Sequence, residues 1–319
     1  MTYFLGVDVG GTKTHALVAD EHGHARGLGH AGPGNHEMVG WEGLEAVLGA
    51  ATAEALARTG ISRDQIAGAG FGVAGYDWAS ERERTLAAIR TLGLTAPVEA
   101  VNDGVLGLIA GASEGWGVAL SAGTGCNCYG RDRQGRIGRM TGEGDTMGEA
   151  AGAGTVVAEA IRHISRAWSR RGPATALTPA FLALAGATEV EQFLEGVCEG
   201  QYSYDAEAAP IVFQVAAQGD AVARTIIEWA GRELGNLAVG VIRQLELEAD
   251  DFEIVLAGSL FEGGPLLTEP LQVTVHAVAP RARFVRLTAP PVVGGVLLGM
   301  EAAGRCNPAL RVSLIASLL

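Results

Sequence analysis

A short stretch near the start of the chain, FLGVDVGGTKT from Phe4 to Thr14, constrains the fold more than any other feature of the sequence. It begins as an apolar run of strand length, and the acidic residue Asp8 interrupts this run close to its end. Gly10 and Gly11 follow, and they predict a tight turn because only glycine takes positive φ without a steric cost. The chain then returns as a second apolar run over residues 15–19. The stretch therefore predicts a β-hairpin with a glycine turn.

The polar residues of this hairpin suit a bound phosphate. A glycine backbone lets N–H groups approach an anion closely, and Thr12 and Lys13 add a hydroxyl and a positive charge at the tip. Asp8 is placed to hold Mg²⁺ through water. An ordinary Gly-Gly hairpin with a buried, capped Asp8 explains the same residues equally well, so the rest of the chain must decide between the two interpretations.

A second strand, glycine turn and returning strand occur near residue 124. Residues 116–122 and 126–131 read as strands on either side of a turn that contains Thr124 and Gly125. Two such hairpins facing one nucleotide would clamp both ends of a triphosphate. The duplication supports the phosphate interpretation more than either copy does alone.

An acidic residue at the end of a predicted strand is a candidate for catalysis. Residues 97–101 read as a strand that ends in Asn102-Asp103-Gly104, ahead of a helix of small and apolar residues. Open α/β sheets bind their ligands at the carboxyl ends of strands, which favours Asp103 as a functional residue. The alternative is that Asp103 is only the N-cap of the helix.

Four more polar or glycine-rich loops lie between the predicted elements. They are residues 32–36 with Asn35, residues 75–78 with Gly75, residues 142–149 with Glu149, and residues 258–264 with Gly258 and Ser259. Asn35 directly precedes a helix predicted over about 37–58, so capping that helix is the commoner use of such a residue. An acidic glycine loop such as 142–149 can hold a metal ion or sugar hydroxyls, or it can be a surface turn.

The remaining elements alternate between strands and helices. Further strands are predicted at 25–31, 66–74, 252–257 and 284–287, and helices at about 80–92, 150–170, 220–244 and 292–303, with 173–244 mostly helical. Capping boxes are predicted for Ser80 with Glu83 and for Thr188 with Glu191.

The size and composition of the chain fit two domains. Its 319 residues correspond to two units of roughly 150 residues, and its 48% hydrophobic content is ample for two cores. Its 47 glycines are about twice the ordinary share of ~7%, and they gather in loops rather than repeats. We expect one domain at 1–115 and another at 116–303, with a last helix at about 304–319 that returns to the first domain.

Charge and cysteine content limit the partners and the compartment. The formal charge of −13 argues against a nucleic acid but not against ATP, since Mg²⁺ can supply positive charge locally. Cys126 and Cys128 share a strand face without metal-ligand spacing, and Cys198 and Cys306 are isolated, which favours a reducing compartment. Neither a signal peptide nor a run of ~20 apolar residues is present, so we expect a soluble, cytoplasmic protein without membrane segments.

Taken in order, these segments resemble the superfamily of ATPases that unites sugar kinases, actin and the heat-shock chaperones. Within it, the chain resembles over nearly its whole length the branch of N-acetylglucosamine kinase and the BadF/BadG/BcrA/BcrD-type ATPases. The matching segments are DVGGTKT at 8–14, AGTGCN at 122–127, LAGS at 256–259 and VGG at 293–295. The resemblance implies an α/β fold of two ribonuclease H-like, actin-like ATPase domains, each a mixed sheet flanked by helices, with ATP in the interdomain cleft.

The resemblance also implies roles for single residues. Asp103 matches the general base that takes the proton from the sugar 6-hydroxyl, and Asp8 would orient Mg²⁺. Contacts with ATP are implied for Gly10, Gly11, Thr12, Lys13, Thr124, Gly125, Gly258 and Ser259. Contacts with the sugar are implied for Asn35, Gly75, Asp103, Asn127 and Glu149.

Two departures from the branch concern the sugar. Glu149 stands where amino-sugar kinases of this branch commonly carry Asp, and Ala74 stands where some carry Ser. Both changes leave the ATP end of the site intact. They therefore affect the identity of the substrate.

Three functions fit the sequence, and the first is favoured. It is the transfer of the γ-phosphate of ATP, with Mg²⁺, to the 6-hydroxyl of an amino sugar, N-acetylglucosamine or glucosamine, by a homodimer. The second is an energy-coupling ATPase similar to the activators of 2-hydroxyacyl-CoA dehydratases, which hold a [4Fe-4S] cluster between subunits through cysteines. Here Cys126 and Cys128 look like packing residues instead. The third is a non-catalytic sugar sensor or actin-like scaffold, and the acid at Asp103 argues against it.

Overall fold

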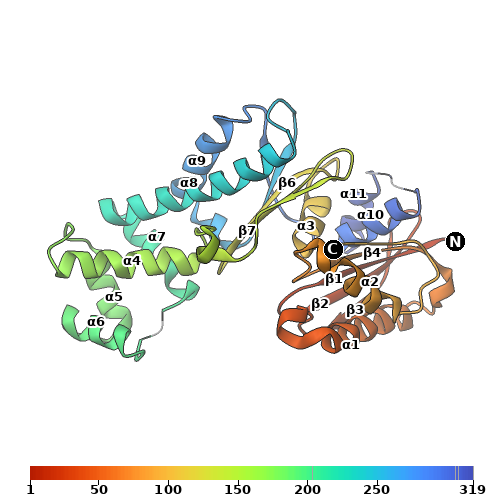
Figure 1. Ribbon diagram of the computed structural model, residues 1–319, viewed down its shortest axis with the longest axis horizontal. Helices are drawn as coiled ribbons and strands as arrows, with labels where there is room; N and C mark the ends of the chain where they lie inside the picture. Colours follow the sequence, from red (N-terminus) through yellow and green to blue (C-terminus); the bar gives the residue numbers. More distant parts are fainter. Residues whose placement is uncertain (203, 306, 308, 319) are drawn as a thin grey trace.

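The computed structural model describes residues 1–202, 204–305, 307 and 309–318. Two α/β units lie at opposite ends of its long axis (Figure 1), and each contains a sheet of five strands. The first sheet consists of β1 (Tyr3–Val9), β2 (Thr14–Asp20), β3 (Ala25–Ala31), β4 (Ile66–Val73) and β5 (Val98–Val101). The second consists of β6 (Gly117–Ala122), β7 (Cys126–Arg131), β8 (Ile137–Arg139), β9 (Glu253–Ala257) and β10 (Arg283–Arg286).

The two sheets have the same topology. The strand orders are β3-β2-β1-β4-β5 and, in the corresponding direction, β8-β7-β6-β9-β10. In each sheet three strands run antiparallel as a meander, and the last two run parallel to the first strand of that meander. The predicted fold class, two mixed α/β sheets flanked by helices, is therefore confirmed, and so is the duplication of the strand–glycine-turn–strand unit.

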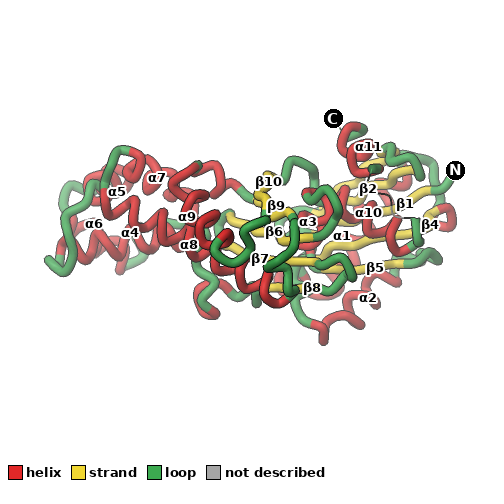
Figure 2. Tube along the Cα trace, turned by 90° about the horizontal axis from the view of Figure 1, so that it is seen from above, coloured by secondary structure: helices red, strands yellow, loops and turns green. Residues whose placement is uncertain are grey.

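The helices are unevenly divided between the two units. They are α1 (His36–Ala57), α2 (Arg82–Arg90), α3 (Asp103–Gly111), α4 (Ala153–Trp168), α5 (Leu177–Ala185), α6 (Val190–Cys198), α7 (Ala209–Ala217), α8 (Ala221–Gln244), α9 (Pro265–His276), α10 (Val292–Ala302) and α11 (Leu310–Ala316). Helices α4 to α9 extend the second unit, as Figures 1 and 2 show. Among them, α5 and α6 pack through an aromatic cluster of Phe181, Phe193, Tyr202 and Tyr204.

Close glycine contacts fix α10 on the first sheet. A Cβ at Gly6 of β1 would lie 2.3 Å from the amide nitrogen of Val296, and one at Gly70 of β4 would lie 2.3 Å from the carbonyl oxygen of Gly295. Only glycine allows the helix backbone to lie this near the strands. We therefore propose that the first domain contains α10 in addition to residues 1–115, with a boundary near residue 290.

The end of the chain also lies against the first unit. Helix α11 packs on α10, and the hydroxyl of Ser317 accepts a hydrogen bond from the amide of Ala25 at 2.9 Å. Arg311 donates to the carbonyl oxygens of Ala110 and Gly111 at the end of α3. Cys306 lies outside the described residues.

Several local predictions are wrong in detail. Gly10 and Gly11 do not adopt positive φ, so the predicted conformational reason for glycine in this turn is wrong. The box predicted for Ser80 and Glu83 does not form, because Glu81 accepts the amides of residues 77 and 78 instead. Gln192, not Glu191, accepts from the amide of Thr188. The two capping errors are shifts of two residues and of one residue along the chain.

Each unit contains an aspartate that closes a β-turn in the same way. Asp20 is the last residue of β2 and accepts from the amides of His22 and His24 and from Arg26. Asp132 follows β7 and accepts from the amides of Gln134 and Arg136 and from the Arg136 guanidinium. Because the two turns occupy equivalent places, the internal duplication extends beyond the glycine turns.

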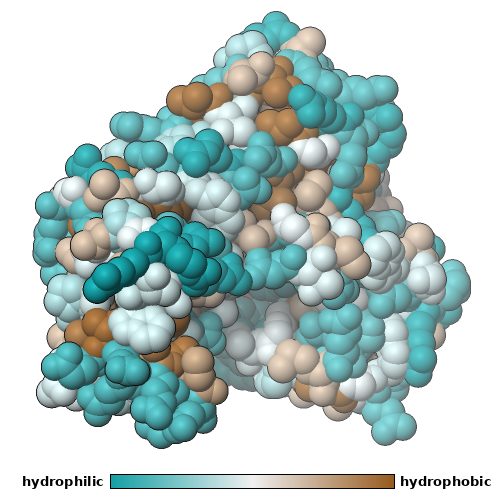
Figure 3. All heavy atoms as spheres, turned by 60° about the vertical axis from the view of Figure 1, so that its left-hand side comes forward, coloured by the Kyte–Doolittle hydropathy of each residue, from teal (hydrophilic) through white to brown (hydrophobic). Residues whose placement is uncertain are grey.

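The surface carries no single dominant apolar region in the view of Figure 3, where hydrophobic residues form separate patches among hydrophilic ones. Within the described residues, no helix combines the length and apolar character needed to cross a membrane.

Candidate active site

The first glycine turn joins β1 to β2 at the carboxyl end of β1. The amide of Gly10 donates to the carbonyl oxygen of Lys13 at 2.9 Å, which closes the turn. Gly11, Thr12 and Lys13 are exposed, and a Cβ at Gly11 would meet no atom within 4 Å. The tip therefore offers a free backbone, a hydroxyl and an ammonium group to an anion approaching from outside.

Asp8 lies two residues before Gly10, and the pKa of its carboxyl group is well above the ordinary value for an aspartate. Burial, and secondarily the charge of Asp103, raise the pKa of Asp8 to about 7, while Lys13 lowers it. A cation placed beside this buried carboxyl group would stabilise its ionised form. No cluster of three or more His, Cys, Asp or Glu ligands exists in the described part of the chain, so a divalent ion here would depend on Asp8, water and a phosphate ligand.

Asp103 is the first residue of α3, directly after β5. The N-cap of this helix is Asn102, whose side chain accepts from the amide of Gly104 at 2.8 Å, so the alternative that Asp103 is the N-cap is wrong. Burial raises the pKa of Asp103 to about 6, although the Gly104 amide counteracts it. The carboxyl end of β5 thus holds an acid that is ionised at neutral pH but far more basic than an exposed aspartate.

The second glycine turn is packed against two other elements. The amides of Ala153 and Gly154, at the start of α4, donate to the carbonyl oxygens of Gly123 and Thr124 at 2.8 and 3.0 Å. A Cβ at Gly125 would meet nothing within 4 Å, so this turn too has one open side. It is one residue shorter than the first turn and has no counterpart of Lys13.

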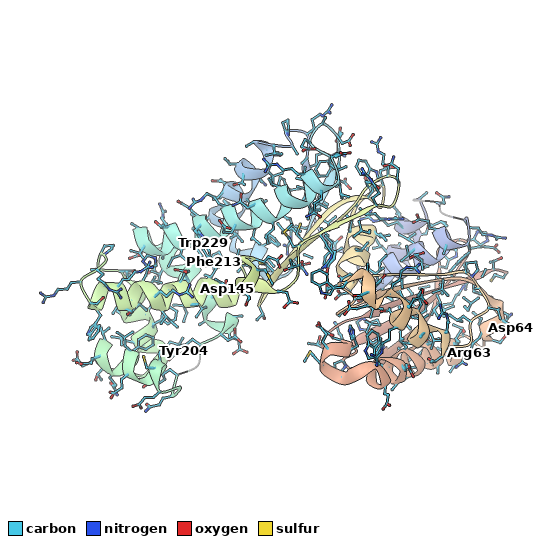
Figure 4. All side chains as sticks on the ribbon, in the orientation of Figure 1. Arg63, Asp64, Asp145, Tyr204, Phe213 and Trp229 are labelled. Atoms are coloured by element: carbon cyan, nitrogen blue, oxygen red, sulfur yellow. The ribbon has the colours of Figure 1, made fainter. Side chains whose placement is uncertain are left out.

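Gly258 brings the predicted nucleoside segment against the second turn. Its φ of +103° and the 2.1 Å that would separate a Cβ from the carbonyl oxygen of Ala122 both require glycine. Ser259 follows at the edge of a cavity of about 340 Å³. The cavity is lined by Ala153, Ala206, Ala209, Pro210, Phe213, Ser259, Leu260, Glu262 and Gly263, and Phe213 is labelled in Figure 4. Its size and apolar walls suit a nucleobase.

Asn35 and Gly75 lie together in the first unit. Asn35 is the N-cap of α1, and its side-chain oxygen accepts from the amide of Glu37 at 2.9 Å, as the capping interpretation predicted. A Cβ at Gly75, which has a φ of +82°, would lie 2.4 Å from that same oxygen. Gly75 therefore lets the loop after β4 approach the start of α1, and the two predicted sugar residues are neighbours.

Asn127 and Glu149 are connected through the loop at 141–149. Glu149 is only 4% exposed, and its carboxylate oxygens accept from the amides of Thr141 and Gly142 at 2.5 and 2.8 Å. The side-chain oxygen of Asn127 accepts from the amide of Cys128 at 2.7 Å, while its amino group faces Gly142. Glu149 thus shapes the loop, and Asn127 keeps an N–H donor for a ligand.

The loop 75–81 contains polar residues for which the sequence suggested no role. Asp77 contacts Asn102 of the first unit and Tyr129 and Arg139 of the second, and Glu81 lies 3.4 Å from His36. These partners are up to 62 residues away along the chain, so no local pattern could have identified them. A separate cavity of about 640 Å³ borders this loop, β5, β7, β8 and the end of α10, and none of the predicted ATP or sugar residues lines it.

Two kinases are similar to this chain over nearly its whole length. A kinase of N-acetylmuramic acid and N-acetylglucosamine from Clostridium acetobutylicum is 25% identical over 303 residues, covering 93% of this chain and 98% of that protein. An N-acetyl-D-glucosamine kinase from Dictyostelium discoideum is 26% identical over 315 residues, with the same coverage of 93% and 98%.

A solved structure supports the fold independently. The crystal structure described as a possible N-acetylglucosamine kinase from Chromobacterium violaceum superposes with a TM-score of 0.62 at 21% identity, covering 93% of this chain and 99% of that one. The family model of the BadF/BadG/BcrA/BcrD ATPases matches residues 5–298, which include both glycine turns, Asp8, Asp103 and Gly258. The chain therefore belongs to the BadF/BadG/BcrA/BcrD ATPase family.

Proposed function

We propose that the protein transfers the γ-phosphate of ATP to the 6-hydroxyl of N-acetylglucosamine. The observation that carries this proposal is Asp103, an acid at the carboxyl end of β5 whose pKa burial raises to about 6. A general base works best when its pKa lies near the working pH, and a hydroxyl acceptor needs such a base. The printed names of the two curated relatives support a kinase acting on an N-acetylated amino sugar.

The nucleotide would lie between the two glycine turns. The backbone of Gly10 and Gly11, with Thr12 and Lys13, would contact phosphates from the first unit, and Thr124 and Gly125 from the second. The cavity beside Gly258 and Ser259 would take the nucleoside. Enzymes catalyse phosphoryl transfer mainly by positioning the reactants and neutralising charge. In this arrangement the polar groups of the two turns would position the phosphates and neutralise their charge.

The predicted Mg²⁺ fits the donor set around Asp8. A single carboxylate combined with water and phosphate oxygens is a usual environment for Mg²⁺ in nucleotide enzymes. When bound, the ion would neutralise charge on the phosphates of ATP. Asp103 would accept the proton of the sugar 6-hydroxyl. As the proton leaves, the oxygen of that hydroxyl would form a bond to the γ-phosphorus, and the bond between the γ-phosphorus and the bridging oxygen of ADP would break.

The contacts of Glu149 favour N-acetylglucosamine over glucosamine. Both of its carboxylate oxygens already accept backbone amides and the side chain is 4% exposed, so Glu149 is directed to its own loop rather than to an ammonium group of a ligand. The amino group of Asn127, which faces Gly142, is a donor that suits the carbonyl of an acetamido substituent. Glu149 would then act on the sugar through the loop, and Asn35 and Gly75 would form the opposite wall.

Cys126 and Cys128 give no support to the energy-coupling alternative. Burial raises the pKa of the Cys126 thiol to about 11, and Cys128 is fully buried. Cluster ligands are thiolates, which burial in apolar surroundings disfavours. A cytoplasmic location and a homodimer stay predictions.

A coupled assay of ADP formation over a panel of hexoses tests the proposal. We expect kcat/KM for N-acetylglucosamine to exceed that for glucose by at least ~10-fold. A pocket that donates hydrogen bonds to the acetamido group has unpaired donors when glucose, which lacks that group, is bound. Mass spectrometry of the product should place the phosphate on the 6-oxygen. ADP formation that is independent of any sugar would contradict the kinase and favour an ATPase.

A further inference from the structure

The side chain of Asp77, in the loop after β4, contacts both units of the molecule. Its carboxylate is 19% exposed and accepts a hydrogen bond from the hydroxyl of Tyr129 on β7. It also lies 3.8 Å from the guanidinium of Arg139 on β8, which in turn lies 4.3 Å from the ring centre of Trp78. β8 is an edge strand of the second sheet, and Figure 2 shows it near β5 and α2 of the first unit. Asp77 thus connects the first unit to an edge of the second sheet.

The same carboxylate reaches the start of α3. The side-chain amino group of Asn102 donates to Asp77 at 3.1 Å, while its oxygen caps α3 through the amide of Gly104. The ring of Tyr129 lies against Gly104, where a Cβ would be 2.7 Å from the ring. Two sets of contacts therefore lead from Asp77 to the residues on either side of Asp103.

The backbone of the loop that carries Asp77 is fixed by contacts that do not involve the Asp77 side chain. The carboxylate of Glu81 accepts from the amides of Asp77 and Trp78 at 2.9 and 2.8 Å. Glu81 also lies 3.4 Å from the imidazole of His36, which stacks on Trp41. A change confined to the carboxylate of Asp77 should therefore leave the loop backbone in place.

A buried carboxylate beside another acid is costly. Desolvation penalises the charge of Asp77, the charges of Glu37 and Glu81 add repulsion, and Asp77 in turn raises the pKa of Asp103. Two hydrogen-bond donors, Tyr129 and Asn102, and the positive charge of Arg139 at 3.8 Å offset this cost. Such a network fixes its members in one arrangement, which a less polar contact between the units would not do.

We propose that Asp77 is a positioning residue, which through Asn102 and Tyr129 fixes the start of α3 and thereby the carboxylate of Asp103 relative to the second sheet. This inference rests on the proposed kinase function for its catalytic consequence. Small displacements of a catalytic group can reduce a rate by about 10²-fold, so the effect should fall on kcat.

Three variants and one control test this role. Asp77→Ala removes the acceptor, Tyr129→Phe removes one donor, and Asp77→Asn keeps an oxygen that can still accept from both Tyr129 and Asn102. Asp132→Ala is the control, because Asp132 is a buried, hydrogen-bonded aspartate in the second unit that does not contact the site. We expect Asp77→Ala to lower kcat by about tenfold or more with the KM for ATP within about twofold, and Asp77→Asn to recover most of the loss.

Hydrogen exchange gives a second readout that does not need activity. The amides of Gly104 and Val105 should exchange faster in Asp77→Ala than in wild type, and at the wild-type rate in Asp132→Ala. If wild type lacks kinase activity, the proposed function fails, and unchanged exchange in Asp77→Ala would then overturn the positioning role separately. Equal losses of kcat in Asp77→Ala and Asp132→Ala, or no recovery in Asp77→Asn, would also overturn it.

Discussion

The charge of Asp103 acts on Asp8: after burial, it is the next cause that raises the pKa of Asp8 to about 7. Both residues belong to the first sheet region: Asp8 lies near the end of β1, and Asp103 lies two residues after β5, with β4 between the two strands. Two acids in a poorly solvated place attract a cation, because it relieves both the desolvation and the repulsion. Under the proposed function, a cation at this place would let a turn with only one lysine bind a triphosphate.

We therefore expect activity to require a divalent cation that Asp8 helps to hold. Chelation should abolish ADP formation, and added Mg²⁺ should restore it. Asp8→Asn should raise the Mg²⁺ concentration needed for half-maximal rate by about tenfold or more, since outer ligands of a metal typically contribute 10- to 100-fold. Unchanged Mg²⁺ dependence in Asp8→Asn would exclude Asp8 from the metal site, and unchanged sugar binding is the control.

Asp103 should set the acidic limb of the pH profile. Because burial raises its pKa to about 6, the protonated form accumulates as the pH falls through 6 and cannot accept the hydroxyl proton. We expect kcat/KM to fall below about pH 6 in wild type, and Asp103→Asn to lower kcat by roughly 10²-fold or more while ATP still binds. Near-normal turnover in Asp103→Asn would remove this residue from the mechanism.

The two glycine turns should matter for ATP and little for folding. Side chains at Gly11 and Gly125 would meet nothing within 4 Å, and neither residue has positive φ. Gly11→Val and Gly125→Val should therefore fold normally yet lose most MgATP affinity by calorimetry, while sugar binding stays detectable. Gly49→Val, in equally open space on α1, is the control. Unchanged ATP affinity in both turn variants would mean that the hairpins are only structural.

The sequence was sufficient for features that depend on near neighbours. The glycine turns, the strands around them and the acid after β5 are each visible within about ten residues, and the duplication made them mutually supporting. Features made by distant residues were not visible. Asp77 meets Tyr129 52 residues later, and the packing of α10 against β1 depends on backbone contacts of glycines almost 300 residues apart.

Glu149 shows the same limit in another form. Its position in an acidic glycine loop suggested a ligand contact, but the amides that occupy it belong to residues 141 and 142 of that same loop. A carboxylate that accepts hydrogen bonds from its own loop and one that binds a ligand produce the same sequence pattern. Only the direction of the side chain separates them.

Asp20, one of the two aspartates that close β-turns, should stabilise the fold without affecting catalysis. Hydrogen bonds from the His24 amide, Arg26 and the His22 amide lower the pKa of Asp20 to about 2, against burial, which raises it. Its contribution to stability is therefore complete above the unfolded value of 3.8 and is lost as the pH falls through about 2. Asp20→Ala should lower the free energy of unfolding by about 1–3 kcal/mol at pH 7.

Urea unfolding at several pH values checks this expectation. The difference between wild type and Asp20→Ala should shrink between about pH 4 and pH 2, while kcat at neutral pH stays unchanged. Glu228→Ala, an exposed position on α8, is the control and should not alter the unfolding midpoint. A difference that is independent of pH would show that the charge of Asp20 contributes nothing.

The last prediction concerns how Glu149 affects the sugar. Its two oxygens accept the amides of Thr141 and Gly142, so Glu149→Gln would place an amino group against one of these N–H donors and displace the loop. We expect the KM for N-acetylglucosamine to rise by about tenfold, equivalent to ~1.4 kcal/mol, with the KM for ATP unchanged. Glucosamine should suffer a similar loss, because the effect arises from the loop rather than from charge pairing. Glu149→Asp, which keeps the charge but is one methylene shorter, should fall between wild type and Glu149→Gln. A loss confined to glucosamine would show instead that Glu149 meets an ammonium group, and it would reverse the expected preference between the two amino sugars.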